Sequence, residues 1–309
     1  MKRVISVFAI FLITCCLCTP ASAAAAKEWT FMVFLNADNN LDAFGVGDMQ
    51  EMAAGGGSND YLNIVCLIDR EHGPATLNYI TKDGPQVVKE MGELDMGDYR
   101  EYVRFVTDVA KAYPAKNYCS IIWNHGSGWK NANGEMIKGI SYDDSSSNHI
   151  TTNQLTVAMK EIKAAIGQNI EVFTFDACLM QMMEVAWEVR GRAGIMVGSE
   201  QNEPAEGWAY HLFLADLKAN PVMTPAQLAT SIVNRYGEYY SGANTQSAVN
   251  LDAIEPLGQA LDVLAGALIA ADTEWSAFNQ ARGLSASYSY ADYRDLPSFL
   301  WALITRTQN

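Results

Sequence analysis

Basic residues are scarce in this sequence of 309 residues. Lysine and arginine number 21 against 35 aspartate and glutamate residues, which leaves a formal net charge of −14 at pH 7. A chain this acidic is repelled by nucleic acid and by anionic lipid, so we expect no nucleic-acid partner. Acidity also suits cationic substrates, although most acidic proteins are merely soluble. The charge therefore excludes one class of function without selecting another.

Signatures of metal sites and of serine hydrolases are also missing. The chain contains no HExxH motif, no Cys/His cluster with zinc spacing and no G-x-S-x-G elbow. Asp143 and Asp144 lie near serines and could bind Ca²⁺, but they lack the EF-hand pattern, so a solvated loop is the better interpretation. We therefore expect that no metal or other cofactor is required, and calcium remains an open alternative.

The N-terminus has the pattern of a targeting segment. A short basic start precedes the apolar run Val4–Cys18, which is too short to span a bilayer comfortably, and Ala21-Ser22-Ala23 fits a cleavage site. We expect residues 1–23 to be a signal peptide and the protein to be secreted or periplasmic, with no transmembrane segment after cleavage. Lipoprotein anchoring at Cys15 is the less favoured alternative.

Few cysteines remain after that cleavage. Cys66, Cys119 and Cys178 are left, and an odd number in an exported protein leaves at least one thiol unpaired. Cys66 and Cys119 lie inside apolar runs, where cysteine usually acts as a small buried hydrophobe. Cys178 differs because it lies just beyond the end of such a run.

Short apolar runs alternate with helical patterns along the first two thirds of the chain. The runs predict strands buried on both faces of a sheet, at residues 29–36, 62–69, 118–124, 170–175 and 194–198, with a further short strand near 139–142. The helical patterns cover about 40–54, 98–113, 151–166 and 179–190. This alternation predicts an α/β fold with a parallel sheet between two layers of helices.

The last third of the chain reads as mostly helical. Its patterns cover residues 208–218, 225–240 and 251–271, and no linker or internal repeat separates them from the rest. We expect one domain over residues 24–309, whose helical C-terminal part comprises about residues 208–309. The sequence stops within an apolar pattern, so we expect that it is truncated.

Reactive side chains follow two of the predicted strands. His125-Gly126-Ser127-Gly128 comes after strand 118–124, and Asp176-Ala177-Cys178 comes after strand 170–175. Sites in parallel sheets form at the carboxyl ends of strands. One helix separates these two strands, and a right-handed crossover would place them side by side or nearly so. The imidazole and the thiol could therefore meet at one edge of the sheet.

A thiol and an imidazole in that position can act as a nucleophile and its base. The thiolate is the reactive form of cysteine, and a neighbouring imidazole can accept its proton. A helix expected to begin near Leu179 would lower the pKa of the Cys178 thiol through its dipole. The backbone N–H groups of Cys178 and Gly126 could bind an oxyanion, because Gly126 has no Cβ to keep a substrate carbonyl away.

Carboxyl groups surround the same predicted edge. Asp176 could either cap the following helix or pair with a basic substrate side chain, and both interpretations remain open. Glu200, Glu203 and Glu206 lie in the loop after the next strand, where they could deepen a cationic pocket or simply be solvated.

Four motifs together resemble the clostripain family of cysteine peptidases, in the clan of caspases, legumain and gingipains. They are WNHGSGW, GISYDD, D-x-C-LM-x-x-x-E-V-A-x-E-x-R and SE-x-x-x-P-x-x-GW-x-Y, and the resemblance runs from about Trp29 to at least Tyr240. It implies a caspase-like three-layer α/β/α sandwich and an endopeptidase that cleaves protein or peptide substrates after Arg or Lys. His125 and Cys178 match the catalytic dyad, and Gly126 and Cys178 match the oxyanion donors.

The resemblance also implies a pocket and an activation step. Asp176 matches the acid at the base of the pocket for the basic P1 residue, and a second acid is expected in the following loop, with Glu206 as first choice and Glu203 as second. Relatives carry Asp near that place, so the preference between Arg and Lys stays open. Family members are often zymogens cut after a basic residue between His and Cys, and Lys138 and Lys130 are the candidates within loop 130–148.

Two alternatives compete with this interpretation. One is a catalytically silent binding protein that keeps the caspase fold. The other is a serine or related hydrolase that uses Ser127, because a glycine-rich turn after a strand can also form the oxyanion loop of such an enzyme.

Overall fold

A central sheet of eight strands organises the chain, in the order β10-β9-β8-β5-β1-β2-β3-β4. The computed structural model describes residues 26–129, 138–242, 244–271 and 274–307. The expected signal peptide, the alternative anchor Cys15 and the candidate cleavage residue Lys130 lie outside these ranges.

The five strands at the centre of the sheet run parallel. They are β1 (Lys27–Ala37), β2 (Leu62–Arg70), β5 (Ala115–Trp123), β8 (Ile170–Asp176) and β9 (Ala193–Ser199). Their apolar residues are buried on both faces of the sheet, as the near-continuous hydrophobic runs predict. All five predicted strands, and the predicted parallel pairing, are confirmed.

Antiparallel strands complete both edges of the sheet. They are β3 (Ala75–Thr81) and β4 (Gly84–Gly92) at one edge and β10 (Gln246–Asn250) at the other. A separate two-stranded sheet consists of β6 (Gly139–Asp143), which was expected, and β7 (Asn148–Thr151), which was not.

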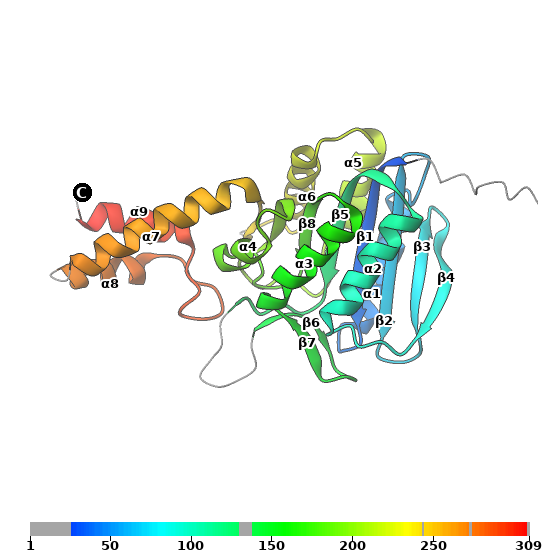
Figure 1. Cartoon of the computed structure of the whole chain (residues 1–309), viewed down its shortest axis with the longest axis horizontal. Coiled ribbons are helices and arrows are strands. Elements are labelled where there is room, and N and C mark those ends of the chain that lie inside the picture. The colour runs from blue at the N-terminus through cyan, green and yellow to red at the C-terminus, as the bar shows by residue number, and fades with distance from the viewer. Residues whose placement is uncertain (1–25, 130–137, 243, 272–273, 308–309) are drawn as a thin grey trace, which may run out of the picture.

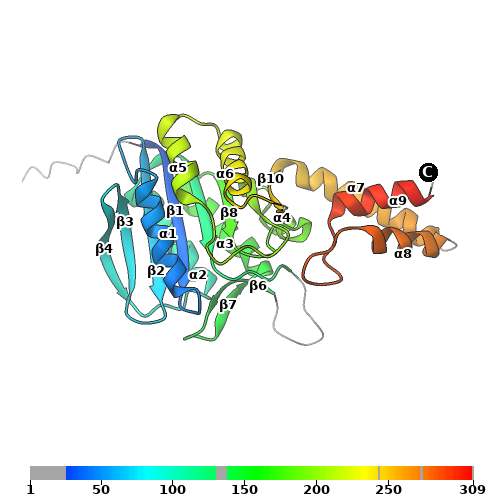
Figure 2. The same ribbon diagram turned by 180° about the vertical axis from the view of Figure 1, so that it is seen from behind.

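Helices cover both faces of the sheet, which makes three layers. One layer contains α2 (Tyr99–Ala112), α3 (Thr152–Ile166) and α4 (Met183–Val189), in front of the sheet in Figure 1. The other contains α1 (Asp42–Ala54), α5 (Tyr210–Ala219) and α6 (Pro225–Tyr239), which face the viewer in Figure 2. Because side chains alternate along a strand, Phe34 of β1 packs on the first layer and Phe31 on the second.

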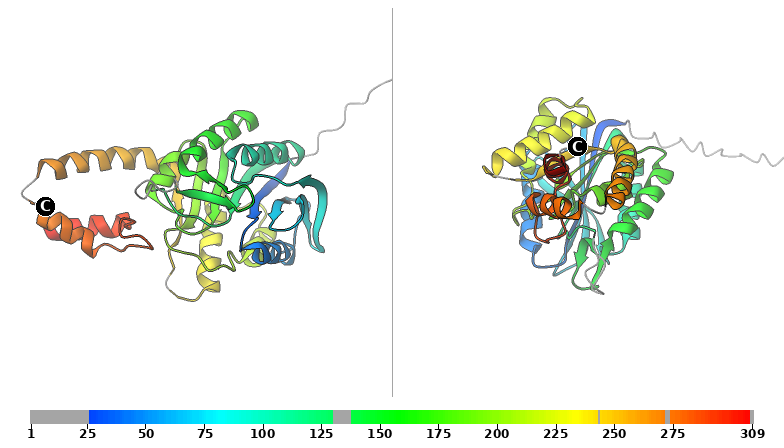
Figure 3. Two further views of the ribbon diagram at one scale, coloured as in Figure 1. Left: turned by 90° about the horizontal axis from the view of Figure 1, so that it is seen from below. Right: turned by 90° about the vertical axis from the view of Figure 1, so that its left-hand side faces the viewer.

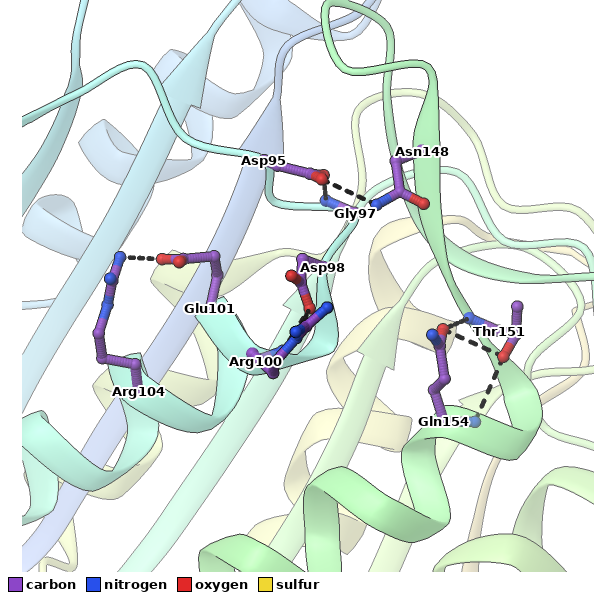
Figure 4. Close-up of polar contacts among 9 residues, drawn as sticks. All are labelled: Asp95, Gly97, Asp98, Arg100, Glu101, Arg104, Asn148, Thr151 and Gln154. Carbon is purple, nitrogen blue, oxygen red and sulfur yellow. Dashed lines mark hydrogen bonds and ion pairs between the residues drawn. The ribbon is translucent and has the colours of Figure 1, made fainter.

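Side-chain caps fix where the helices of the first layer begin. The Asp98 side chain accepts a hydrogen bond from the backbone N–H of Arg100 at the start of α2, and Thr151 forms a reciprocal capping box with Gln154 at the start of α3 (Figure 4). Asn148 donates to Asp95, which joins β7 to the segment before α2.

The remaining helices form an arm that leads away from the sheet (Figures 1 and 3). The arm contains a 3₁₀ turn (Leu251–Ala253), α7 (Ile254–Ala270), α8 (Trp275–Leu284) and α9 (Leu296–Thr307). Phe278 and Leu303 belong to a small core between α8 and α9. Both helices lie in the C-terminal part that was expected to be helical, although the sequence patterns did not delimit them. By length and composition alone, the run Leu251–Ala270 could cross a membrane, and 6% of its most apolar stretch is buried. The expected lack of a transmembrane segment therefore stays a prediction.

Candidate active site

The loops that carry His125 and Cys178 converge at one edge of the sheet. β5 and β8 are adjacent and parallel, Trp123 lies opposite Asp176, and the backbone N–H of Asn124 donates to the carbonyl of Asp176 at 3.2 Å. Gly126 then passes so close to the next loop that a Cβ on it would lie 2.2 Å from the carbonyl oxygen of Cys178. Only glycine fits there, because the absence of a Cβ lets the two loops come into contact.

A cavity of about 490 Å³ lies between these loops. Five of the residues singled out from the sequence line it: His125, Gly126, Asp176, Cys178 and Glu203. The segment after β9 forms another wall of the cavity. Glu206, in that segment, is exposed and does not line the cavity. Of the two proposed pocket acids, it is thus Glu203 that faces the thiol.

The imidazole of His125 is oriented by an amide that the sequence analysis missed. Its Nε2 lies 2.7 Å from Oδ1 of Asn40, in the turn after β1. An amide oxygen can only accept, so Nε2 carries the proton and Nδ1 is left as the basic nitrogen. Burial lowers the pKa of His125, with a smaller opposing effect from Asp144, so the ring is neutral at pH 7. A neutral imidazole is the form that can accept a proton.

The sulfur of Cys178 is held by the backbone of Glu203. The N–H of Glu203 donates to Sγ at 3.2 Å, and the thiol donates to the carbonyl of the same residue at 3.8 Å. Among the hydrogen bonds of the described residues, none joins the ring of His125 to Sγ. The two groups therefore share a cavity while each keeps a different partner.

The pKa of the Cys178 thiol is raised, which corrects the expectation that a helix dipole lowers it. Burial is the main cause, and the charge of Asp176 adds to it. The expected helix from Leu179 to Arg190 is also too long, because α4 begins only at Met183. Leu179 has a positive φ of 65° and Met182 is extended, so the N-terminus of the helix is too far from the sulfur for its dipole to act strongly.

Asp176 is buried at the wall of the cavity and does not cap a helix. Its Oδ2 accepts from the backbone N–H of Trp208 at 3.2 Å and from the hydroxyl of Tyr210 at 2.9 Å. Burial nevertheless raises the pKa of Asp176 to about 7. The pKa of Glu203 is raised well above its usual range by burial and by the nearby Asp176 and Cys178. At neutral pH Glu203 is therefore protonated, and Asp176 is protonated in about half of the molecules.

A third carboxyl lies beside Asp176 and was not predicted. Asp48 of α1 is buried and accepts a hydrogen bond of 2.6 Å from Nε1 of Trp123. A Cβ on Gly207 would lie 3.1 Å from Asp176 and 3.2 Å from Asp48, so both carboxyls press against this residue. The sequence signal was an aspartate among the core-facing residues of a helix, next to buried Met49.

The C-terminal part also reaches the cavity, which the sequence did not indicate. Ser289 and Tyr290 line it, and Ser289 donates to Oδ1 of Asn202 at 2.9 Å. The hydroxyl of Tyr293 donates to the carbonyl of Ser127 at 2.8 Å. Lys138 lies with its ammonium group 5.2 Å from the centre of the Tyr290 ring and 3.4 Å from its hydroxyl.

Ser127 is used structurally. Its hydroxyl is 2.5 Å from the hydroxyl of Tyr142 and 3.2 Å from the carbonyl of Gly139, and it accepts from the N–H of Gly139 at 3.1 Å. It does not line the cavity. The serine-hydrolase alternative therefore has no nucleophile in place.

Within the described ranges, no group of three or more His, Cys, Asp and Glu side chains has the arrangement of a metal site. Asp143 accepts from the backbone N–H groups of Met96 and Ser146, at 2.9 and 2.8 Å, and so organises a loop. The dependence on calcium stays untested.

A protein family and several solved structures match this chain. The model of the Clostripain family matches residues 33–304. Clostripain from Hathewaya histolytica is 27% identical over 225 residues, which cover 62% of this chain and 43% of that protein. The chain thus spans less than half the length of this curated relative.

Solved structures show the same fold at lower identity. A secreted C11 cysteine protease from Bacteroides thetaiotaomicron, in complex with an irreversible peptide inhibitor, superposes with a TM-score of 0.67 and 21% identity, over 90% of this chain and 78% of that one. An inactive zymogen C11 protease from Parabacteroides distasonis gives a TM-score of 0.60 and 22% identity, over 84% and 66%. The caspase-like α/β/α architecture is confirmed.

Proposed function

The chain belongs to the clostripain family, and from that membership we propose that it is an exported cysteine endopeptidase that cleaves after arginine or lysine. One observation carries the proposal: His125 and Cys178 line the same cavity, into which the buried carboxyl of Asp176 also faces. A thiol, a neutral imidazole and a buried acid are what thiol proteolysis after a basic residue requires.

The reaction would begin with a proton transfer. Nδ1 of His125 takes the proton of Cys178, whose sulfur first leaves the backbone of Glu203. The thiolate attacks the substrate carbonyl, and the N–H groups of Gly126 and Cys178 stabilise the oxyanion. The imidazolium then protonates the leaving amine, and water hydrolyses the acyl-enzyme, with His125 again acting as the base.

The basic P1 side chain would bind toward Asp176. Glu203 is the better second acid because it lines the cavity, whereas Glu206 is exposed. A guanidinium or ammonium group would replace the protons that these carboxyls hold at neutral pH.

A panel of fluorogenic peptides with Arg, Lys, Asp or Asn at P1 tests this proposal. We expect cleavage of the Arg and Lys peptides by the wild type, and loss of activity in Cys178→Ala and Cys178→Ser. A preference for Asp or Asn would contradict the proposed specificity for a basic P1 residue, but not the catalytic roles of His125 and Cys178. Activity that survives Cys178→Ser would exclude the dyad, and binding of all peptides without cleavage would favour the silent binding protein.

Self-processing within loop 130–148 is part of the proposal. Lys138 directly precedes β6 and lies beside Tyr290 of the cavity wall, and its carbonyl accepts from the backbone N–H of Thr152 at 3.2 Å. We expect the wild type to become nicked while Cys178→Ala remains one chain. Lys138→Ala should remain intact if cleavage follows Lys138, and should still be nicked if cleavage follows Lys130. Both proteins remaining intact after prolonged incubation would contradict self-processing.

A further inference from the structure

Asp48 lies behind the cavity, in contact with residues that line it. Its side chain is 3% exposed and reaches from α1 toward the end of β5, where the indole N–H of Trp123 donates to it. Gly207, on the other side, touches both Asp48 and Asp176 and adopts a φ of 63°. Trp123 and Gly207 line the cavity. Asp48 is thus one layer removed from the space that a substrate side chain would occupy.

No cation neutralises this carboxyl cluster. Across the described ranges, no lysine or arginine forms an ion pair with Asp48, Asp176 or Glu203. Buried carboxyls without a nearby cation favour the protonated form, and a bound cation would favour their ionised form.

The groups that face Asp48 are acidic or neutral. Burial is the main cause of the raised pKa of Asp48, and the charges of Asp176 in β8 and Glu51 in α1 add to it. Glu51 itself lies 3.0 Å from Nδ1 of His211. Cys66 of β2 and the Tyr210 hydroxyl of α5 also feel the charge of Asp48, and burial keeps both protonated. When a cation binds, the groups that can release protons are therefore the carboxyls, not Cys66 or Tyr210.

We propose that Asp48 is a positioning residue of the substrate pocket, which acts through Asp176 across Gly207 and couples the binding of a cationic side chain to the release of protons from both carboxyls. This inference rests on the proposed function, because it assumes that a basic group binds at Asp176. It adds a residue from α1 that does not line the cavity.

The coupling predicts tighter binding of a cation as pH rises. The pKa of Asp176 is about 7 and that of Asp48 about 9, both raised above the ordinary range of aspartate. A bound cation favours the ionised carboxyls, so the affinity grows as the free site loses its protons between about pH 6 and pH 9. A site with one ordinary carboxylate would show no such rise in this range, because that group is already ionised.

Benzamidine, a small amidinium, is a suitable probe. Its affinity for the wild type, Asp48→Asn and Asp69→Asn is measured by calorimetry from pH 6 to pH 9, in buffers of different ionisation enthalpy so that proton release is counted. Asp69 is the matched control, since it is a buried aspartate of β2 whose pKa is also raised, to about 7, and it does not line the cavity.

For the wild type we expect affinity to rise by about tenfold per pH unit for each proton released. In Asp48→Asn only Asp176, with a pKa of about 7, is left to release a proton, so the rise in affinity should end about two pH units lower than in the wild type. Proton release at pH 8 should then be lost, while Asp69→Asn keeps the wild-type profile. Trp123→Phe removes the hydrogen bond that lowers the pKa of Asp48, so its midpoint should move upward.

The outcomes separate the two proposals. If benzamidine binds the wild type and both Asp48→Asn and Trp123→Phe keep its pH profile, the role proposed for Asp48 is wrong and the acidic pocket for a basic side chain stands. If Asp48→Asn does not fold, the upward shift in Trp123→Phe supports the inference and an unchanged midpoint overturns it. If benzamidine does not bind the wild type at any pH, both the proposed pocket for a basic side chain and the inference about Asp48 are wrong.

Discussion

Asn40 fixes the imidazole of His125 through a single hydrogen bond of 2.7 Å. The bond selects the tautomer in which Nδ1 is the base, so its loss would let the ring rotate and exchange tautomers. Asn40→Ala should therefore lower kcat by about a hundredfold, with a smaller change in KM. Steady-state kinetics with an Arg peptide would measure this, with the exposed Asn153→Ala as control. An unchanged kcat would mean that Asn40 does not orient the ring during turnover.

The thiol of Cys178 provides a second prediction. Burial and Asp176 raise its pKa, so the thiolate fraction of the resting enzyme at pH 7 is small. Labelling by iodoacetamide should be slow at pH 7 and should accelerate by about tenfold per pH unit up to at least pH 9. Mass spectrometry would follow the label, and Cys178→Ala should remain unlabelled because Cys66 and Cys119 are buried. Fast labelling that is already constant between pH 6 and 7 would instead indicate a lowered pKa.

Single residues of the site differ in how far the sequence predicts them. His125 and Cys178 each follow a strongly apolar strand, and a parallel sheet brings such ends together. Asn40 and Asp48 carry no comparable signal, because one polar residue in a turn or on a helix is ordinary. Their roles depend on β1 and α1 being packed beside β5, which only the assembled sheet shows.

At the scale of elements, the segment between α8 and α9 joins the arm to the active site. Ser287 and Arg294 form an antiparallel bridge across it, and Ser289 has a positive φ of 55°. Tyr293 contacts the loop of His125, and Ser289 contacts Asn202 in the loop after β9. This segment therefore touches both walls of the cavity and helps to set the distance between them.

Tyr293→Phe tests that connection. The ring packs so tightly that a Cβ on Gly128 would lie 2.8 Å from it, and the hydroxyl binds the carbonyl of Ser127. Removal of the hydroxyl should lower the free energy of unfolding by about 1 kcal/mol and also reduce kcat/KM, because the loop of His125 loses an anchor. Thermal unfolding and peptide kinetics would be compared with Tyr61→Phe, whose side chain is 55% exposed. Loss of stability with full activity would limit Tyr293 to a structural role.

Strongly apolar elements were predictable, and half-exposed ones were not. The hairpin of β3 and β4 lies at the edge of the sheet, and most of β4 is exposed, so it lacks an apolar run. The start of α4 was placed too early because residues 179–182 are apolar enough to look helical. In the structure Leu179 lies in a turn with a positive φ, Met182 is extended, and Gln181 donates its backbone N–H to the carbonyl of Ser199 at 3.0 Å.

At the scale of the whole molecule, both the protein and its pocket are acidic. The net charge is −14, and the buried carboxyls of Asp176 and Asp48 and the buried Oε2 of Glu203 have no basic partner in the described part of the chain. The general field should attract a cationic peptide from a distance, whereas the pocket acts only after contact. These two effects differ in how they respond to salt, since screening weakens exposed charges far more than buried ones.

Ionic strength can therefore separate attraction from chemistry. Raising it from about 0.01 M to about 0.5 M should lower kcat/KM for an Arg peptide by about tenfold, mainly through KM, because steering of the cation is screened. The rate at which iodoacetamide, a neutral reagent, labels Cys178 should hardly change over the same range, since no charge is attracted. Stopped-flow or initial-rate kinetics would give the first quantity and mass spectrometry the second. If kcat/KM is insensitive to salt, the charge of the molecule does not guide its substrate. If salt slows both reactions equally, salt alters the active site itself.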